Sequence, residues 1–266
     1  MVKLTDEEFN EIAQFTVENY GINLFKKRHL IQSRLNTLLA GKGLTSYSEL
    51  IRLIKSNNQA EITEVLNRLT TNHTYFFREP EHFEFLKEVI LPEWQAGNRR
   101  SIRIWSAGCS SGEEAYTTVM VMKNFFGLDD PNWDYRVFAT DISTKVLGIA
   151  KKAVYTSEAV KHIPESWLKR FFVDCGGAYQ LKDEIRRHVS FSVFNLLDEF
   201  DGHKGYDLIL CRNVMIYFDQ ELRNRLVNKF YESLCSGGYL FIGHAETIPK
   251  GVSDFTYIKP AIYKKA

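Results

Sequence analysis

The sequence lacks the features typical of membrane-spanning, secreted or disulfide-linked proteins. It has no run of about 18 apolar residues and no charged-then-apolar leader. Cysteine is scarce and never paired at a short spacing: the four cysteines are Cys109, Cys175, Cys211 and Cys235. These absences exclude a disulfide framework and a cysteine-ligated zinc site. We therefore expect a cytoplasmic protein without membrane insertion, whose thiols stay reduced.

A large excess of charge is also missing. The formal net charge is +1, which does not indicate a basic protein that binds nucleic acid. No metal site is predicted, because six histidines lack the spacing of metal ligands: His73, His82, His162, His188, His203 and His244. Hydrophobic residues make up 44% of 266 residues, enough to form the core of one large domain or two modest ones.

Residues 1–75 are predicted to form a small helical domain. Thr5 and Glu8 have the spacing of a capping box at the start of a first helix. Helices are predicted at residues 7–18, 24–39, after Ser46, and 61–69. No strand-like alternation occurs in this part of the sequence.

From about residue 100, short apolar runs alternate with helical segments. Strands are predicted at residues 102–106, 136–140, 189–193, 206–210 and 238–242. Helices are predicted at residues 113–126, 143–150 and 219–234, with a terminal hairpin at 256–258 and 261–263. This alternation predicts an α/β domain over residues 76–266, with a largely parallel sheet and helices on both faces.

Residues 155–188 interrupt this alternation and contain the pair Gly176 and Gly177. The segment exceeds the usual length of a loop. Either it forms a small inserted subdomain or the strand count is wrong, and we favour the subdomain.

A glycine-containing loop, residues 106–112, joins the first predicted strand to a helix. Gly108 and Gly112 permit close backbone approach to a ligand at the carboxyl edge of the sheet. The loop matches neither the dinucleotide G-x-G-x-x-G pattern nor a phosphate loop. Glu113 and Glu114 at the helix start suit a cationic ligand, such as S-adenosylmethionine, better than a phosphate. The alternative is that both glutamates only complement the helix dipole.

Three further predicted strands end beside polar residues. Asp141 has the spacing from the glycine loop that suits binding of ribose hydroxyls, or it caps the following helix. Asn195 and Leu196 follow the third strand and together suit an adenine ring, although Asn195 alone is more often a turn residue. Arg212 precedes an apolar stretch, so it needs a partner.

The segment over residues 70–79 mixes polar and aromatic side chains, which is unlike a flexible tether. It forms either a lid over the site or a hydrophobic connection between the domains. Both hold if its aromatic residues pack while Asn72, Thr74 and Arg78 face the ligand.

Five segments resemble the CheR family of chemotaxis receptor methyltransferases, over nearly the whole chain. They are residues 70–79, 104–114, 138–142, 194–197 and 211–219. The resemblance implies a Rossmann-like class I methyltransferase sheet, the cofactor S-adenosyl-L-methionine and the product S-adenosyl-L-homocysteine. It implies a cofactor pocket formed by Asn72, Thr74, Arg78, Ala107, Gly108, Glu113 or Glu114, Asp141, Ile142, Asn195, Leu196, Cys211 and Arg212. It also implies that Arg78, Arg212 and Tyr217 flank the transferred methyl and act in catalysis.

The implied reaction is methyl transfer to glutamate side chains on the cytoplasmic helical bundle of chemotaxis receptors. Four basic residues are candidates for contacting that partner, or for packing their stems around a buried helix face: Lys26, Lys27, Arg28 and Arg34. Some family members bind a receptor's C-terminal pentapeptide through the inserted subdomain. The stretch over residues 173–178 looks shorter here than in those tail-binding members. We therefore expect an enzyme that does not depend on the receptor tail.

A carboxylate acceptor is already ionised at neutral pH, because a free glutamate has a pKa of about 4.3. No general base is required, which agrees with a predicted site of arginines and a tyrosine. The alternatives are a methyltransferase acting on another protein and a non-catalytic adaptor that senses the cofactor on receptors. A nicotinamide dehydrogenase is disfavoured by the missing glycine pattern.

Overall fold

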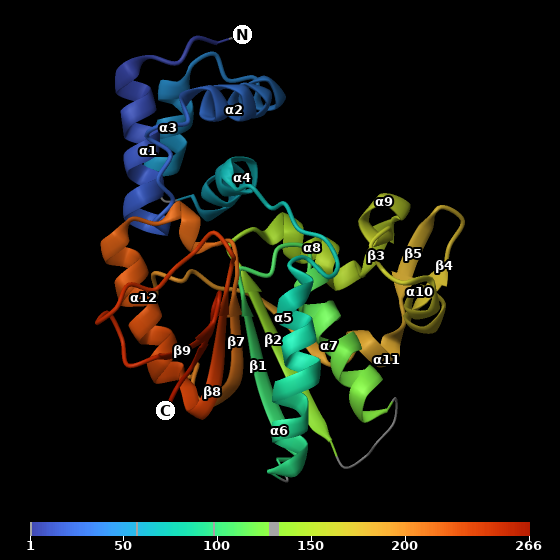
Figure 1. Cartoon of the computed structure of the whole chain (residues 1–266). Coiled ribbons are helices and arrows are strands. Elements are labelled where there is room, and N and C mark those ends of the chain that lie inside the picture. The colour runs from blue at the N-terminus through green and yellow to red at the C-terminus, as the bar shows by residue number, and fades with distance from the viewer. Residues whose placement is uncertain (1, 57, 98, 128–132) are drawn as a thin grey trace.

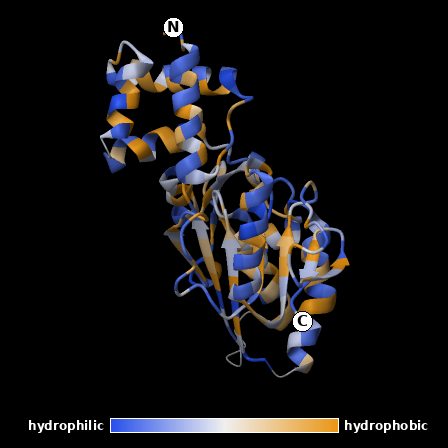
Figure 2. Cartoon of the chain, turned by 90° about the vertical axis from the view of Figure 1, so that its left-hand side faces the viewer, coloured by the Kyte–Doolittle hydropathy of each residue, from blue (hydrophilic) through white to orange (hydrophobic). Residues whose placement is uncertain are grey.

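A computed structural model describes residues 2–56, 58–97, 99–127 and 133–266. A bundle of four helices stands beyond the carboxyl ends of the strands of a larger α/β domain (Figures 1 and 2). The bundle helices are α1 (Asp6–Tyr20), α2 (Arg28–Lys42), α3 (Tyr47–Lys55) and α4 (Gln59–Leu69). A separate hydrophobic core joins these helices.

The predicted capping box at the start of α1 is confirmed. The Thr5 hydroxyl accepts from the backbone N–H of Glu8, whose carboxylate accepts from the backbone N–H of Thr5. Helix α2 begins at Arg28 rather than at Leu24, so Lys26 and Lys27 precede the helix. Leu24 is still buried, which is why the apolar pattern placed the helix start too early.

A sheet of seven strands lies in the order β6-β2-β1-β7-β8-β10-β9. Its strands are β1 (Ser101–Ala107), β2 (Asp134–Asp141), β6 (Val189–Val193), β7 (Tyr206–Cys211), β8 (Leu234–Ile242), β9 (Thr256–Lys259) and β10 (Ile262–Lys264). The first five pair in parallel, and the last two form the predicted antiparallel hairpin. The parallel α/β prediction is confirmed.

Alternate residues of the strands face two different hydrophobic cores. Ile102 and Ile104 of β1 face one core, whereas Trp105 and Ala107 face the other. The first core is shared with α7 (Glu113–Phe126) and α8 (Thr144–Lys152), and the second with α12 (Gln220–Ser233). Helices therefore cover both faces of the sheet, as Figure 1 shows.

A helix that the sequence analysis did not predict connects the bundle to β1. It consists of α5 (Pro80–Phe85), the π-helical turn Leu86–Ile90 and α6 (Leu91–Ala96). Pro92 lacks the N–H that an α-helix needs at that position, and the wide turn directly before it accommodates the loss. Two prolines in one segment hid the helix from the sequence pattern.

The segment between α8 and β6 forms its own small sheet, as favoured above. Its three antiparallel strands have the order β3-β5-β4. The elements of the insertion are β3 (Val154–Thr156), α9 (Ser157–Val160), α10 (Glu165–Phe171), β4 (Phe172–Asp174), β5 (Ala178–Leu181) and α11 (Asp183–Arg186). Among the described helices, none is long and apolar enough to cross a membrane.

Candidate active site

A cavity lies at the carboxyl ends of the parallel strands, beneath the helical bundle. Most residues predicted for the site contribute to its wall: Asn72, Thr74, Arg78, Gly108, Glu114, Asp141, Ile142, Asn195, Leu196, Arg212 and Tyr217. Ala107, Glu113 and Cys211 are not among the residues that line it. Ala107 and Cys211 are strand residues whose side chains are buried in a hydrophobic core.

The helical bundle closes one side of this cavity, which the sequence analysis missed. The bundle residues in the wall are Tyr20, Ile22, Leu24, Lys27, Leu30 and Leu69. The amide of Asn195 donates to the carbonyl oxygen of Asn19 at 2.8 Å, and the backbone N–H of Asn23 donates to the carbonyl oxygen of Tyr217 at 3.0 Å. Apolar residues at helix ends resemble ordinary core residues, so the sequence carries no signal for this role.

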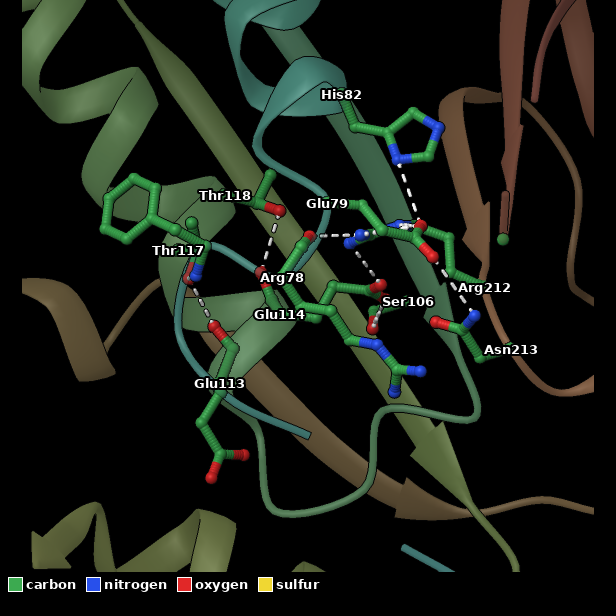
Figure 3. Close-up of polar contacts among 12 residues, drawn as sticks. Arg78, Glu79, His82, Ser106, Glu113, Glu114, Thr117, Thr118, Arg212 and Asn213 are labelled. Atoms are coloured by element: carbon green, nitrogen blue, oxygen red, sulfur yellow. Dashed lines mark hydrogen bonds and ion pairs between the residues drawn. The ribbon is translucent and has the colours of Figure 1, made fainter. Parts of the chain in front are cut away.

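The structure distinguishes between the two adjacent glutamates at the start of α7. Glu114 lines the cavity, where its carboxylate accepts from the Ser106 hydroxyl at 2.6 Å and from Arg212 at 3.1 Å. The Glu113 carboxylate points away from this cluster in Figure 3 and accepts from the hydroxyl of Ser111. Glu114 is therefore the glutamate available to a ligand.

Arg212 is buried between two carboxylates, which satisfies the expectation that it needs a partner. Its Nη1 donates to Glu114, while Nε and Nη2 donate to Oε2 of Glu79 at 3.3 and 3.0 Å. Nη2 also donates to the backbone carbonyl of Arg78. The guanidinium is thus committed to holding its neighbours in place, which leaves it little capacity to receive a third carboxylate.

Glu79 is the centre of a second group of contacts. Its Oε1 accepts from the Asn213 amide at 3.1 Å and from the backbone N–H of His244 at 3.2 Å. Burial alone would raise the pKa of Glu79, but interactions with His82, Arg212 and Asn213 hold that pKa below its ordinary value. Glu79 therefore remains ionised opposite Arg212 throughout the neutral range.

Two histidines without a predicted role meet at this carboxylate. Ligand-type atoms of Glu79, His82 and His244 lie within 4.8 Å of one another. Burial lowers the pKa of His82, so its ring is neutral at neutral pH. A metal ion here would have to compete with Arg212 for the carboxylate of Glu79. We therefore interpret this group as support for Arg212.

Arg78 differs from Arg212 in what it contacts. Among the described residues, its guanidinium makes one hydrogen bond, from Nη1 to the carbonyl oxygen of His73 at 2.7 Å. In Figure 3 the guanidinium of Arg78 points away from the cluster of Arg212 and Glu79. Arg78 and Tyr217 both line the cavity, and Nζ of Lys27 lies 5.0 Å from the centre of the Tyr217 ring. Arg78 therefore keeps N–H groups available for an incoming anion.

Asp141 lines the cavity and also contacts the backbone at the start of the following helix. One carboxylate oxygen accepts from the backbone N–H of Ser110 and the other from that of Ser143, each at 2.9 Å. The second contact lies at the start of α8, where Ser143 is the N-cap residue. Burial raises the pKa of Asp141, while these backbone hydrogen bonds oppose the rise. The two hydrogen bonds fix the orientation of the carboxylate, which lies in the wall of the cavity.

The segment joining the bundle to α5 contacts both the cavity and the inserted subdomain, and Tyr75 takes part in both contacts. Asn72, Thr74 and Arg78 line the cavity. The aromatic residues between them pack on the inserted subdomain, with these ring centroid distances: Tyr75 to His162 5.2 Å, Phe76 to Tyr155 4.9 Å, Phe76 to Phe172 5.5 Å and Phe77 to Trp167 5.3 Å. The segment is at once a wall of the site and a connection between domains.

A cavity at the carboxyl ends of parallel strands is the place where open α/β proteins bind their ligands. Residues 7–70 match the family model described as the CheR methyltransferase all-alpha domain, and residues 72–263 match that of its SAM binding domain. The chain belongs to the CheR methyltransferase family.

Curated relatives agree along nearly the full chain. A chemotaxis protein methyltransferase of Borreliella burgdorferi is 42% identical, and the alignment covers 99% of this chain and 96% of the relative. That of Escherichia coli is 35% identical, covering 98% and 91%. Chemotaxis protein methyltransferase 1 of Pseudomonas aeruginosa is 35% identical, covering 91% and 90%. The family model and these relatives together show an S-adenosylmethionine-dependent methyltransferase.

The affinity for S-adenosylhomocysteine is expected to fall on acidification, starting above the range of an ordinary glutamate. Burial raises the pKa of Glu114, with Arg212 and Ser106 opposing the rise. We expect the Glu114 carboxylate to attract the ammonium group of the product. Protonation would remove that negative charge, so binding should weaken as the pH falls through that raised pKa. Calorimetric titrations from neutral pH down to about 4.3 check this.

Glu114→Gln should weaken S-adenosylhomocysteine binding at neutral pH and make that affinity depend less on pH. Titration of Asp141 should account for the pH dependence that remains. Glu113→Gln is the matched control, because Glu113 is also buried but does not line the cavity. A loss of affinity in Glu113→Gln alone would contradict the assignment of Glu114.

Proposed function

We propose that the protein transfers the methyl group of S-adenosylmethionine to glutamate side chains of chemotaxis receptors and forms glutamyl methyl esters. One observation carries this proposal: Arg78 and Tyr217 line one cavity with Glu114, and the Arg78 guanidinium keeps donors available for a carboxylate. The printed names of the relatives support a role in chemotaxis.

The polar groups that line the cavity suit the parts of the cofactor. Glu114 would face the ammonium group, and Asp141 would accept from the ribose hydroxyls. Asn195 and Leu196 would contact the adenine, since both line the cavity beyond the end of β6. The bond from the Asn195 amide to the carbonyl of Asn19 fixes the orientation of this side chain. When bound, the cofactor supplies a methyl group activated by its sulfonium.

The acceptor needs orientation more than activation. A glutamate carboxylate is ionised at neutral pH, and its reaction with a sulfonium cancels both charges, which a pocket of low polarity favours. Arg78 would hold one carboxylate oxygen, while the hydroxyl of Tyr217 donates a hydrogen bond. An arginine that held both oxygens tightly would make the carboxylate a poorer nucleophile. Alignment of this kind contributes about 7–11 kcal/mol in well-oriented systems.

Two measurements on the same protein test the proposal. Calorimetric titration with S-adenosylhomocysteine should show binding, and incubation with receptor cytoplasmic fragments and labelled cofactor should show transfer. Binding without transfer to any receptor would instead support the adaptor that senses the cofactor. Transfer to another protein but not to receptors would support a methyltransferase with a different substrate.

We further propose that the cytoplasmic helical bundle of the receptor approaches over the start of α2. Lys26 and Lys27 are exposed there, and Lys27 also lines the cavity. Arg28 instead pairs with Asp6 at 2.6 Å, and Arg34 donates to three backbone carbonyls at the end of α4. The two lysines are therefore better placed than the two arginines to attract an acidic receptor surface.

Replacing both Lys26 and Lys27 with glutamine should raise the KM for receptor fragments about tenfold. The affinity for S-adenosylhomocysteine should stay within about twofold, and added salt should affect the variant less than the wild type. Kinetics at two ionic strengths measure this, with Lys87→Gln on the helix before β1 as the control. An unchanged KM would remove these lysines from the receptor contact.

Methylation is expected not to depend on the receptor's C-terminal tail. The two strands of the insertion that flank the glycine pair have only three and four residues, β4 and β5. A short edge strand offers few backbone groups to an added peptide strand. Receptor fragments with and without the last five residues should be methylated at rates within about twofold of each other. A tenfold lower rate on the truncated fragment would contradict this.

A further inference from the structure

The backbone on both sides of Arg78 has an unusual conformation. Phe77 has a φ of 60° and Glu79 a φ of 55°. Residues other than glycine rarely adopt this left-handed backbone conformation. Such strained residues persist only where the surrounding structure holds them, and they gather at functional sites. Two of them flank the arginine that faces the cavity, so their supports decide where Arg78 lies.

Glu79 is held from the sheet side. Its carboxylate contacts Arg212, Asn213 and the backbone N–H of His244. The carbonyl of Arg78 itself accepts from Arg212. These contacts fix the end of the strained segment that leads into α5.

Phe77 is held from the other side by aromatic rings. Its ring centroid lies 5.3 Å from that of Trp167 and 5.9 Å from that of Phe83, both in edge-to-face geometry. The backbone N–H of Phe77 donates to the hydroxyl of Thr117 at 3.3 Å. Trp167 belongs to α10 of the inserted subdomain, and it is not among the residues that line the cavity.

We propose that Trp167 is a positioning residue for methyl transfer. Its ring holds Phe77 in the strained conformation, and Phe77 and Glu79 together fix the backbone from which Arg78 reaches the acceptor carboxylate. The proposal rests on the function proposed above for Arg78. It gives the inserted subdomain a direct part in the reaction, independent of any receptor tail.

The test is a double-mutant cycle in methyl transfer to receptor fragments. Trp167→Leu should lower kcat about tenfold, because a small displacement of a positioning group is costly, while S-adenosylhomocysteine affinity stays within about twofold. Trp167→Phe should restore most of kcat. In an Arg78→Ala background, Trp167→Leu should cause almost no further loss, since residues that act as one unit are not additive.

Trp133→Leu is the matched control. Trp133 belongs to the hydrophobic core against which the partly buried Trp167 packs, and it stacks on Phe126. It precedes β2, at the opposite end of the strands from the cavity. Its loss should add fully to that of Arg78→Ala. Phe77→Leu removes the other ring of the Phe77–Trp167 contact and should have the same effect as Trp167→Leu. The test therefore stays valid if one of the two variants folds poorly.

Four outcomes decide the proposal. The proposal is supported if the kcat loss of Trp167→Leu does not add to that of Arg78→Ala while the loss of Trp133→Leu does. Two results would overturn the positioning role alone, provided that the wild type is active. One is that the kcat losses of Trp167→Leu and Arg78→Ala add fully in the double variant. The other is that Trp167→Leu lowers the cofactor affinity as much as it lowers kcat. A wild type that transfers no methyl to receptors overturns the proposed function, and the role of Trp167 with it.

Discussion

Arg212→Met is expected to lower the free energy of unfolding by about 3–5 kcal/mol. The substitution leaves Glu79 and Glu114 as two largely buried carboxylates without their shared cation. Removing one partner of a buried ion pair is costly because the remaining charge stays desolvated. Denaturant unfolding of the wild type and the variant measures the loss, and S-adenosylhomocysteine binding should weaken in parallel.

Two comparisons sharpen this expectation. Arg186→Met breaks an ion pair with the exposed Asp183, and it should cost less than about 1 kcal/mol. The loss in Arg212→Met should also shrink as the pH falls, because protonation neutralises the stranded carboxylates. A variant as stable as the wild type would mean that Arg212 does not hold the site together.

Arg78→Ala is expected to lower kcat about 100- to 1000-fold while the affinity for S-adenosylhomocysteine stays within about twofold. Among the described residues, the Arg78 guanidinium gives one hydrogen bond, and its acceptor is a backbone carbonyl, so its loss strands no carboxylate there. The two substitutions should thus have opposite effects: loss of Arg212 should lower stability, whereas loss of Arg78 should lower turnover. Arg78→Lys should recover part of the rate, since a charge remains but the planar geometry does not.

Steady-state kinetics with receptor fragments and calorimetry with the product measure the two quantities separately. Arg52→Ala, an exposed arginine of α3, is the control and should leave both unchanged. Full activity of Arg78→Ala with normal product affinity would remove Arg78 from the reaction.

The sequence predicted the parts of the molecule that local patterns specify. Five parallel strands, the terminal hairpin and the capping box of α1 all follow from periodicity and end signals in the chain. The polar residues at strand ends came together because the carboxyl ends of parallel strands share one edge of the sheet. Asp141 is the last residue of β2 and Asn195 lies two residues beyond the end of β6, and both line the cavity.

What the sequence did not predict depends on contacts between distant segments. Glu113 and Glu114 are adjacent, and only packing against β1 and Arg212 decides which one faces the cavity. The sequence predicted that Arg212 needs a partner, but it did not identify Glu79 and Glu114 as the two carboxylates that enclose it. The bundle side of the cavity arises from how two domains meet, for which a single sequence gives no periodic signal.

The chemical nature of the transferred methyl tests the central claim most directly. The protein is incubated with S-adenosylmethionine labelled in its methyl group and with a receptor cytoplasmic fragment, and the labelled fragment is then treated with mild base. A methyl ester on a glutamate side chain should release the label as methanol, and replacing the modified glutamates with alanine should abolish labelling. A label that survives base, or no labelling of receptor fragments by a protein that binds the cofactor, would contradict the account.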